Sequence, residues 1–320
     1  MAGMPPRRRT LTLAVPTAVV ATLALGACSS GGSGGSGGGA DAAGITVLAS
    51  FYPLQYVAQQ VGGDLVSVDT LTPPGAEPHD LELSPAQVDE VGRSDLVVYL
   101  SDFQAAVDDA VDANAPAHVV DAAQDTELHA AEHDEEGEEH AEDDGHEHGS
   151  LDPHFWLDPS RLPAVADDVA AQLSDIDPDN ADTYAANAEA FTTAMTDLDT
   201  EYREGLATCD TRAIVTTHEA FSYLAERYDL EQVGIAGVDP EGEPSPARLA
   251  EVGQVVRDEN VGTIFFETLA SPKVAETLAA ELGVETAVLD PLEGLTDDSQ
   301  DYVSVARTNL ETLRTALGCA

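Results

Sequence analysis

Three histidines and one aspartate lie in predicted loops, two of them directly after strand-like segments, and together they suit a metal ion. The four residues are His79, His154, His218 and Asp290. Three imidazoles and one carboxylate form a nitrogen and oxygen set that fits tetrahedral Zn²⁺, with bonds of about 2.0–2.2 Å. Proteins with open parallel sheets bind small molecules and ions beyond the carboxyl ends of the strands. These positions therefore predict a zinc site where two such sheets meet.

The segment around His154 is Asp152-Pro-His-Phe-Trp-Leu-Asp-Pro159, and it contains the only tryptophan of the chain. Pro153 fixes its own φ and biases Asp152 towards an extended conformation. The segment is therefore expected to form a stiff, non-helical wall of a site. The simpler interpretation is a turn into a helix that begins near Ser160.

The spacing alone leaves other interpretations open. The histidines could be unrelated, His218 could cap a helix, and Asp290 could belong to a plain turn before Pro291. A zinc-dependent hydrolase is a further alternative, with Glu219 as a general base. A catalytic zinc keeps three protein ligands and one open position for water, so a set of four protein ligands argues against an enzyme.

Residues 121–150 combine histidines with many acidic residues and almost no large apolar side chains. Such a composition cannot bury enough apolar surface to fold, so a disordered, metal-attracting loop is expected. Its histidines are candidates for weak metal sites: His129, His133, His140, His146 and His148. The alternative is a solvated acidic loop that only touches metal.

Strand-like and helical patterns alternate on both sides of a long helical segment, which predicts an α/β fold with mainly parallel sheets flanked by helices. We expect two lobes joined by a long rigid linking helix. The predicted division is an N-terminal lobe over 45–160, a linking helical segment over 161–206 and a C-terminal lobe over 207–320.

The chain has 320 residues, with 60 acidic residues against 13 lysines and arginines, and a formal net charge of −47. A surface of this charge repels nucleic acid, so nucleic acid is excluded as a partner.

Residues 1–27 have the features of a lipoprotein signal peptide. Arg7 to Arg9 are followed by an apolar run, Leu11 to Leu25, that is too short to be a good membrane span. Leu25-Gly-Ala-Cys28 resembles a bacterial lipobox, so Cys28 is expected to carry lipid and residues 28–44 to form a flexible tether. The protein is expected outside the cell membrane, anchored to its outer face. An ordinary signal peptide is the alternative.

Cys209 and Cys319 remain in the mature part of the chain. In an exported protein an isolated pair of cysteines is most simply a disulfide. The bond would tie the C-terminus to the start of the C-terminal lobe.

Several segments, in order and covering nearly all of residues 45–317, resemble the metal-specific solute-binding proteins of bacterial ABC importers, the ZnuA/TroA-like cluster A-I family. The matching segments are Ala49–Leu54, Gly75–Asp80, Asp152–Pro159, Thr217–Leu224, Glu243–Leu249, Ile264–Glu267 and Leu289–Pro291.

The resemblance implies two lobes linked by one rigid long helix, and it places the four metal ligands of the family on His79, His154, His218 and Asp290. Zinc members carry histidine at the third position, where many manganese members carry glutamate, so zinc is expected rather than Mn²⁺. The implied function is capture of Zn²⁺ and its delivery to an ABC-importer permease by a monomer. A manganese-binding counterpart and a surface adhesin are the alternatives within the family.

Three glutamates near these positions are also of interest. Glu77 and Glu219 are neighbours of the expected ligands and could compete for the ion, whereas Glu267 is expected to support a ligand from its strand. His118 matches no ligand position and is interpreted as an ordinary strand histidine.

Overall fold

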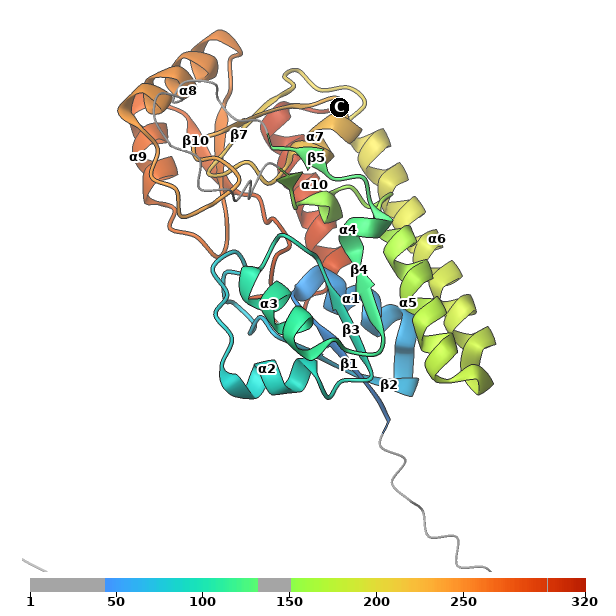
Figure 1. The fold of residues 1–320 in the computed structure, drawn as a ribbon. Coiled ribbons are helices and arrows are strands. Elements are labelled where there is room, and N and C mark those ends of the chain that lie inside the picture. The colour runs from blue at the N-terminus through green and yellow to red at the C-terminus, as the bar shows by residue number, and fades with distance from the viewer. Residues whose placement is uncertain (1–43, 132–150, 298) are drawn as a thin grey trace, which may run out of the picture. The chain divides into compact units, whose positions relative to one another are not determined.

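A computed structural model describes residues 44–131, 151–297 and 299–320, all within one structural unit, residues 43–320 (Figure 1). The predicted signal peptide, the lipidation site Cys28 and most of the tether lie outside the described residues. Four histidines of the predicted loop also lie outside them: His133, His140, His146 and His148.

The first sheet contains four parallel strands in the order β2-β1-β3-β4. The strands are β1 Ile45–Ala49, β2 Val66–Thr70, β3 Leu96–Tyr99 and β4 Val119–Asp121. Helices connect and cover them: α1 Tyr52–Gly62, α2 Pro85–Val91, α3 Ala105–Asn114 and α4 Ala122–Asp125. Helix α2 begins at Pro85, where the Ser84 side chain accepts a hydrogen bond from Gln87 N and the proline occupies the first turn.

The second sheet also contains four parallel strands, in the order β10-β9-β7-β8. The strands are β7 Ala213–Thr216, β8 Glu231–Gly234, β9 Thr263–Phe266 and β10 Glu285–Val288. Its helices are α7 Ser222–Arg227, α8 Pro246–Asp258, α9 Lys273–Leu282 and α10 Tyr302–Leu317. When the strands of each sheet are numbered in chain order, both sheets have the order 2-1-3-4. The predicted α/β fold with parallel sheets is confirmed, and the two lobes repeat one strand order.

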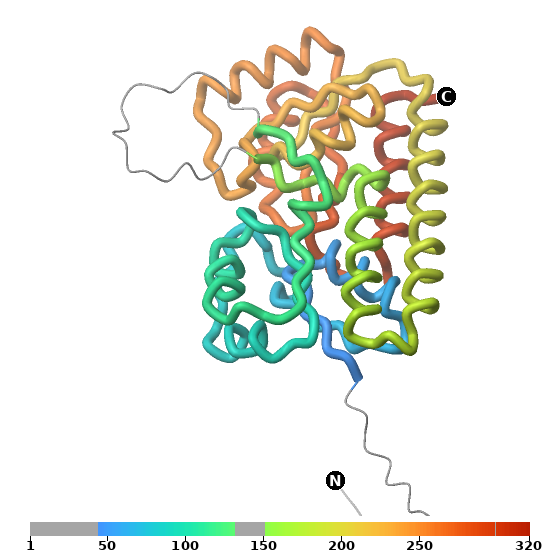
Figure 2. Tube along the Cα trace, turned by 45° about the vertical axis from the view of Figure 1, so that its right-hand side comes forward, coloured from blue at the N-terminus to red at the C-terminus, as the bar shows by residue number. Residues whose placement is uncertain are grey.

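The linking segment consists of α5 Leu162–Ile176, a short 3-10 helix Pro178–Asn180 and α6 Ala181–Gly205, a helix of 25 residues. Figures 1 and 2 show α5 and α6 side by side. Near its start, α6 reaches the first lobe through Asn187 Nδ2, which donates to Val61 O at 2.9 Å. Near its end, Tyr202 OH donates to Ala306 O of α10 at 2.6 Å. The predicted linking helix is confirmed, and it contacts both lobes.

One hydrophobic core runs from the first lobe through the linking helices into the second lobe. Trp156 is at its centre and is fully buried. Its indole Nε1 donates to Pro291 O at 2.8 Å, and its backbone O accepts from Tyr302 OH at 2.5 Å. The wall predicted around His154 therefore packs against the second lobe, although Phe155–Leu157 forms a 3-10 turn rather than extended chain.

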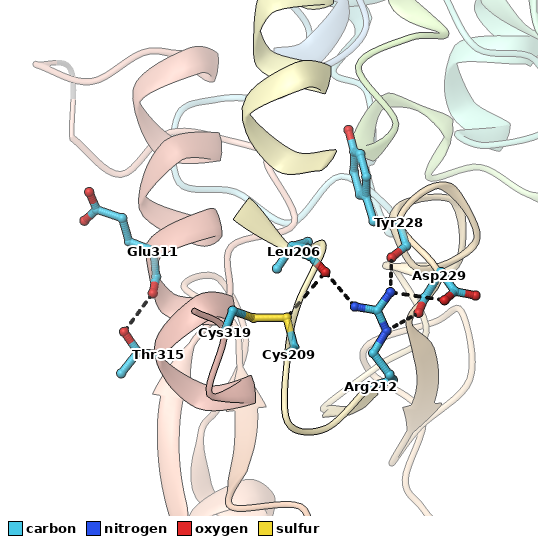
Figure 3. Close-up of a disulfide and its surroundings, with 8 residues drawn as sticks. All are labelled: Leu206, Cys209, Arg212, Tyr228, Asp229, Glu311, Thr315 and Cys319. Atoms are coloured by element: carbon cyan, nitrogen blue, oxygen red, sulfur yellow. Dashed lines mark hydrogen bonds and ion pairs between the residues drawn. A yellow bond between two sulfur atoms is a disulfide. The ribbon is translucent and has the colours of Figure 1, made fainter. Parts of the chain in front are cut away.

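The predicted disulfide between Cys209 and Cys319 is present (Figure 3). It joins residues 110 positions apart, and the chain-entropy model gives a loop of that length about 4–5 kcal/mol of stabilisation. Beside it, the Arg212 guanidinium donates to backbone oxygens of Leu206, Tyr228 and Asp229 at 2.6–3.0 Å. The end of α10 and the start of the second lobe are thus held together.

The structure corrects one prediction near the histidine-rich segment. Residues 121–150 were expected not to fold, but α4 packs there and β5 His129–Ala130 pairs antiparallel with β6 Leu151–Asp152. Ala122 is fully buried, and the hydroxyl of Tyr223 accepts a hydrogen bond from His129 N at 2.8 Å. Contacts with distant residues order this part of the chain despite its polar composition. Within the described ranges, no helix is long and apolar enough to cross a membrane.

Candidate metal centre

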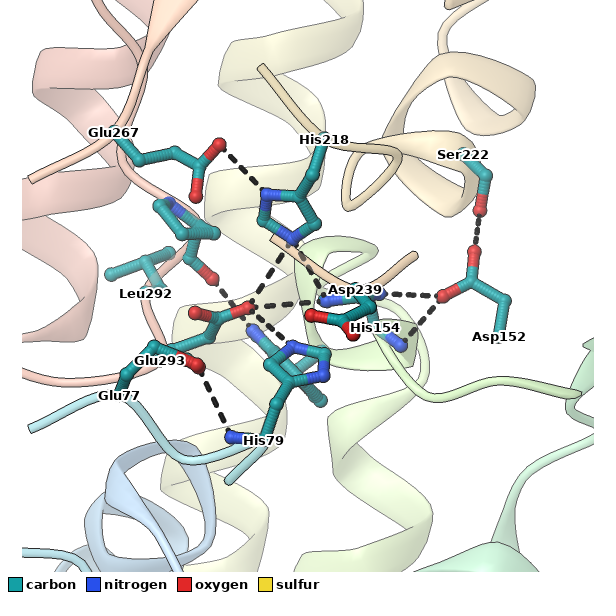
Figure 4. Close-up of polar contacts among 12 residues, drawn as sticks. Glu77, His79, Asp152, His154, His218, Ser222, Asp239, Glu267, Leu292 and Glu293 are labelled. Carbon is teal, nitrogen blue, oxygen red and sulfur yellow. Dashed lines mark hydrogen bonds and ion pairs between the residues drawn. The ribbon is translucent and has the colours of Figure 1, made fainter. Parts of the chain in front are cut away.

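Four side chains from four separate loops meet between the lobes, and their potential ligand atoms all lie within 4.8 Å of one another (Figure 4). They belong to His79, His154, His218 and Glu293. Glu293 Oε1 lies 3.3 Å from His79 Nε2, 3.1 Å from His154 Nε2 and 3.6 Å from His218 Nε2. The Nε2 atoms of His154 and His218 are 3.3 Å apart.

These separations match those of a zinc coordination shell. A regular tetrahedron with a zinc ion at its centre and bonds of about 2.0–2.1 Å has edges of about 3.3 Å between its ligand atoms. The four measured edges range from 3.1 to 3.6 Å. Three imidazole nitrogens and one carboxylate oxygen can therefore surround a zinc ion with small adjustments of the side chains.

The structure brings together three of the four residues predicted from the sequence. His79 lies in the loop after β2, His154 in the turn after β6, and His218 in the loop after β7. The first two come from the N-terminal lobe. The side chains of His154 and His218 are completely buried, Glu293 is 1% exposed and His79 is 13% exposed. The cluster is therefore almost closed to solvent.

The fourth prediction, Asp290, is wrong as a member of this cluster. Its Oδ1 accepts from Leu292 N at 2.8 Å, and its Oδ2 accepts from Thr268 Oγ1 at 2.9 Å. The chain turns sharply after Pro291, with Leu292 at φ +59°. This turn directs Glu293, the residue after Leu292, towards the imidazoles. The sequence signal that was missed is a second carboxylate directly after the Asp-Pro turn.

Two further carboxylates hold the rings of the buried histidines. Asp152 Oδ1 lies 2.7 Å from His154 Nδ1, and Glu267 Oε1 lies 2.7 Å from His218 Nδ1. The hydroxyl of Ser222 donates to Asp152, and the hydroxyl of Thr217 donates to Glu267. A carboxylate on Nδ1 fixes the ring orientation and makes Nε2 a stronger metal ligand. The supporting role expected for Glu267 agrees with this geometry.

Burial and these carboxylates set the protonation of the cluster. Burial alone would lower the pKa of His218, but Glu267 and Glu293 outweigh it and raise that pKa to about 10. The pKa of His154 is also raised, because Asp152 and Glu293 outweigh burial. Burial lowers the pKa of His79. The three imidazoles hold the pKa of Glu293 well below its usual value, in spite of its burial.

The other residues singled out in the sequence lie around the cluster rather than in it. Glu77 Oε1 accepts from His79 N at 3.0 Å, and burial raises the pKa of Glu77 to about 7. Glu219 Oε1 pairs with Arg248 Nη2 at 3.2 Å. His118 Nδ1 contacts Gln172 Oε1 at 3.1 Å, consistent with a structural histidine.

His129 is the one histidine of the predicted loop that the structure describes. Its Nδ1 lies 3.2 Å from Glu226 Oε2, and its Nε2 lies 2.9 Å from Arg161 Nη2. The ring also stacks on Tyr223, with centroids 4.3 Å apart. Both ring nitrogens thus contact protein groups, so metal binding by His129 would require Arg161 or Glu226 to move.

The chain matches a known family over most of its length. The family model described as "Zinc-uptake complex component A periplasmic" matches residues 47–316. The high-affinity zinc uptake system protein ZnuA of Bacillus subtilis is 36% identical over 278 residues, which cover 85% of this chain and 87% of that protein. The zinc-binding lipoprotein AdcA of Streptococcus pneumoniae is 36% identical over 278 residues, or 84% of this chain.

The chain spans about half the length of the streptococcal AdcA proteins, 55% for the S. pneumoniae protein. Solved structures show the same fold. The laminin-binding protein Lmb of Streptococcus agalactiae superposes with a TM-score of 0.76 at 34% identity, covering 86% of this chain and all of that chain. The metal-dependent lipoprotein YcdH from B. subtilis gives a TM-score of 0.71 at 34% identity, covering 85% and 99%.

Proposed function

Because the chain belongs to the family of periplasmic zinc-uptake components, we propose that it is an extracytoplasmic zinc-binding protein that delivers Zn²⁺ to the permease of an ABC importer. The ligands are His79, His154, His218 and Glu293. The observation that carries the proposal is the agreement of four of the six separations between their ligand atoms, 3.1–3.6 Å, with the edges of a zinc tetrahedron, all six being within 4.8 Å. The homologues named for zinc uptake and zinc binding support the same cargo.

The chemistry of the ligands favours zinc over manganese. Imidazole nitrogens suit Zn²⁺, whereas carboxylate, carbonyl and water oxygens suit Mn²⁺, and three of the four ligands are imidazoles. Four protein ligands also fill a tetrahedral shell, so no position is left for the water that a zinc hydrolase activates. The protein is a carrier and not an enzyme.

Burial of the ligands implies how the ion enters and leaves. His79 and His154 come from the first lobe, His218 and Glu293 from the second, and three of the four side chains are at most 1% exposed. An ion can reach such a cluster only when the lobes separate. Closing the lobes completes the tetrahedron, and opening them against the permease releases the ion.

The remaining parts of the proposal concern location. We place lipid on Cys28, so that the tether 28–44 holds a monomer at the outer face of the membrane. The lobes then comprise residues 45–160 and 207–320, joined by the linking segment 161–206. The lipoprotein names of homologues support this location.

A surface adhesin is the second candidate, because the similar structure of Lmb is described as that of a bifunctional protein with adhesin and metal-transporting activity. Binding of the metal-free and zinc-loaded protein to immobilised laminin would test it. Adhesion would be supported by saturable binding that a matched acidic control protein does not show.

The test of the main proposal is to purify the protein without added metal and measure its metal content. We expect one tightly held zinc per chain, determined by elemental analysis and by competition with a chromophoric chelator. A large excess of Mn²⁺ should not displace it. Loss of the zinc to manganese, or the absence of any tight equivalent, would contradict zinc capture.

A further inference from the structure

The chain between β10 and Glu293 is fixed at nearly every polar group. Asp290 N donates to Asn309 Oδ1 at 2.9 Å, and Asn309 Nδ2 returns a bond of 2.7 Å to Asp290 O. Trp156 Nε1 donates to Pro291 O at 2.8 Å. Leu292 N donates to Asp290 Oδ1 at 2.8 Å. The four groups between Asp290 N and Leu292 N therefore all have partners, contributed by α10, the His154 segment and Asp290 itself.

Leu292 occupies the left-handed region at φ +59°, and its side chain is 2% exposed. L-amino acids other than glycine, asparagine and aspartate rarely adopt this conformation, because Cβ then approaches the carbonyl oxygen. A residue persists there when its surroundings over-determine it, and such residues cluster at functional sites. Here the bond from Leu292 N to the Asp290 carboxylate closes the turn, and the burial of the leucine side chain anchors it.

We propose that Asp290 is a positioning residue for the fourth zinc ligand: its carboxylate closes the turn that directs Glu293 at the three imidazoles. The inference rests on the proposed function, since Glu293 matters only if the cluster binds metal. Asp290 acts through Glu293 and does not touch the ion.

The second oxygen of Asp290 connects this turn to the support of another ligand. Asp290 Oδ2 accepts from Thr268 Oγ1 at 2.9 Å. The preceding residue, Glu267, lies 2.7 Å from His218 Nδ1. Two adjacent residues at the end of β9 thus support both ligands of the second lobe. The end of β9 therefore sets the position of His218 and, through Asp290, that of Glu293.

The first experiment compares Asp290→Asn with Asp290→Ala. Asparagine keeps an oxygen that can accept from Leu292 N, whereas alanine removes it. We expect Asp290→Asn to keep nearly the parent affinity for zinc and Asp290→Ala to lose about 10–100-fold, the usual loss when a group that supports a ligand is removed. The readout is chelator competition, with the melting temperature of each metal-free variant as a check of folding.

Asp297→Ala is a matched control. Asp297 makes the same type of bond in the same loop, accepting from Ser299 N at 2.9 Å, but it is exposed and outside the cluster. We expect its zinc affinity to equal that of the parent. If Asp290→Asn loses as much as Asp290→Ala, the negative charge or direct ligation explains the effect and the inference is wrong.

A double-mutant cycle distinguishes positioning from a general structural role. In a Glu293→Gln background the ligand is already impaired, so adding Asp290→Ala should cost little further affinity. The Co²⁺-substituted Asp290→Ala protein should also show the visible spectrum of Glu293→Gln. An equal loss in both backgrounds would overturn the inference.

Two other outcomes are separable from this one. If Asp290→Ala does not fold, the same cycle is run with Thr268→Val, which leaves Asp290 in place and removes the hydroxyl that holds its second oxygen. The loss of zinc affinity should again vanish in the Glu293→Gln background. Persistence of that loss in the Glu293→Gln background would count against positioning. If the parent itself holds no tight zinc, the proposed function fails, whatever the variants do.

Discussion

His79 and His218 are the same type of ligand from opposite lobes, but their surroundings differ. Both lie near Glu293 Oε1, at 3.3 and 3.6 Å. His218 also has Glu267 at 2.7 Å from its Nδ1, whereas the ring of His79 packs edge-on against Phe103, with centroids 4.8 Å apart. The pKa of His218 is raised to about 10, and that of His79 is lowered by burial.

The contrast shows that a carboxylate beside the ring changes both the protonation and the orientation of an imidazole ligand. At neutral pH His79 is neutral and ready to bind zinc, whereas His218 carries a proton that the ion must displace. In return, Glu267 orients His218 and strengthens its Nε2 as a ligand. In the metal-free protein at neutral pH, the second lobe thus supplies an imidazole that is held by a carboxylate and protonated, and the first lobe supplies an unprotonated one.

The largest expected effect comes from removing either imidazole. His79→Ala and His218→Ala should each lower zinc affinity by more than about 100-fold, beyond the 10–100-fold typical of supporting residues. His118→Ala is the control, since His118 lies outside the cluster. Chelator competition measures the zinc affinity of all three variants. Equal affinities would contradict the assignment of His79 and His218 as zinc ligands.

The same pair should differ in metal-free stability. His218→Ala leaves Glu267 buried without its ionic partner, which typically costs about 3–5 kcal/mol. His79→Ala leaves no buried carboxylate without a partner, because Glu293 retains its contacts with His154 and His218. Thermal melting should therefore show the larger decrease for His218→Ala, and the reverse order would contradict the comparison.

A smaller effect, on the stability of the metal-free protein, is expected from Glu267→Gln, and this effect depends on pH. The pKa of His218 is about 10 in the folded protein, against an ordinary value of 6.5 for histidine. A raised pKa contributes stability that is fully present below pH 6.5 and is lost as the pH rises towards 10. The metal-free parent should therefore lose stability between these pH values.

Glu267→Gln should flatten that loss, because it removes one of the two carboxylates that raise the pKa of His218. Melting of the metal-free proteins from pH 6.5 to 9.5 tests this. Glu285→Gln, on the exposed start of β10, is the control and should keep the parent slope. The same slope in all three proteins would mean that Glu267 does not hold the proton on His218.

The smallest effect on zinc affinity is expected from loosening the first-lobe loop that carries His79. Gln104 Nε2 donates to Pro78 O at 3.1 Å and to Thr72 Oγ1 at 3.0 Å, and so holds the loop that carries His79. Gln104→Leu should weaken zinc binding by about fivefold, which corresponds to about 1 kcal/mol for a lost hydrogen bond. Gln172→Leu, which removes the partner of His118, is the control. A loss of zinc affinity in Gln104→Leu as large as that in the histidine variants would contradict this prediction. It would mean that zinc binding depends on the position of the His79 loop as strongly as on the ligands themselves.

Much of this architecture was predictable because the determinants are local. Alternation of strand-like and helical patterns identified the two α/β lobes. The spacing left the histidines as candidates, and the family resemblance placed three of them in the cluster. His79 and His218 follow parallel strands, whose carboxyl ends are where such sheets bind ligands. The linking helix followed from the length of the helical segment between the two lobes.

The sequence by itself determined most strands and helices of both lobes and the disulfide partners, and its resemblance to a known family pointed to the three histidines of the cluster. Only the tertiary structure decided that Glu293 and not Asp290 completes it, because the direction of a three-residue turn depends on Thr268, Asn309 and Trp156, which are distant in the chain. It also decided that the pKa of His218 is raised in the metal-free protein, since that requires Glu267 and Glu293 beside the ring. Short-range patterns specify backbone conformation, whereas side-chain direction and protonation depend on neighbours that folding brings together.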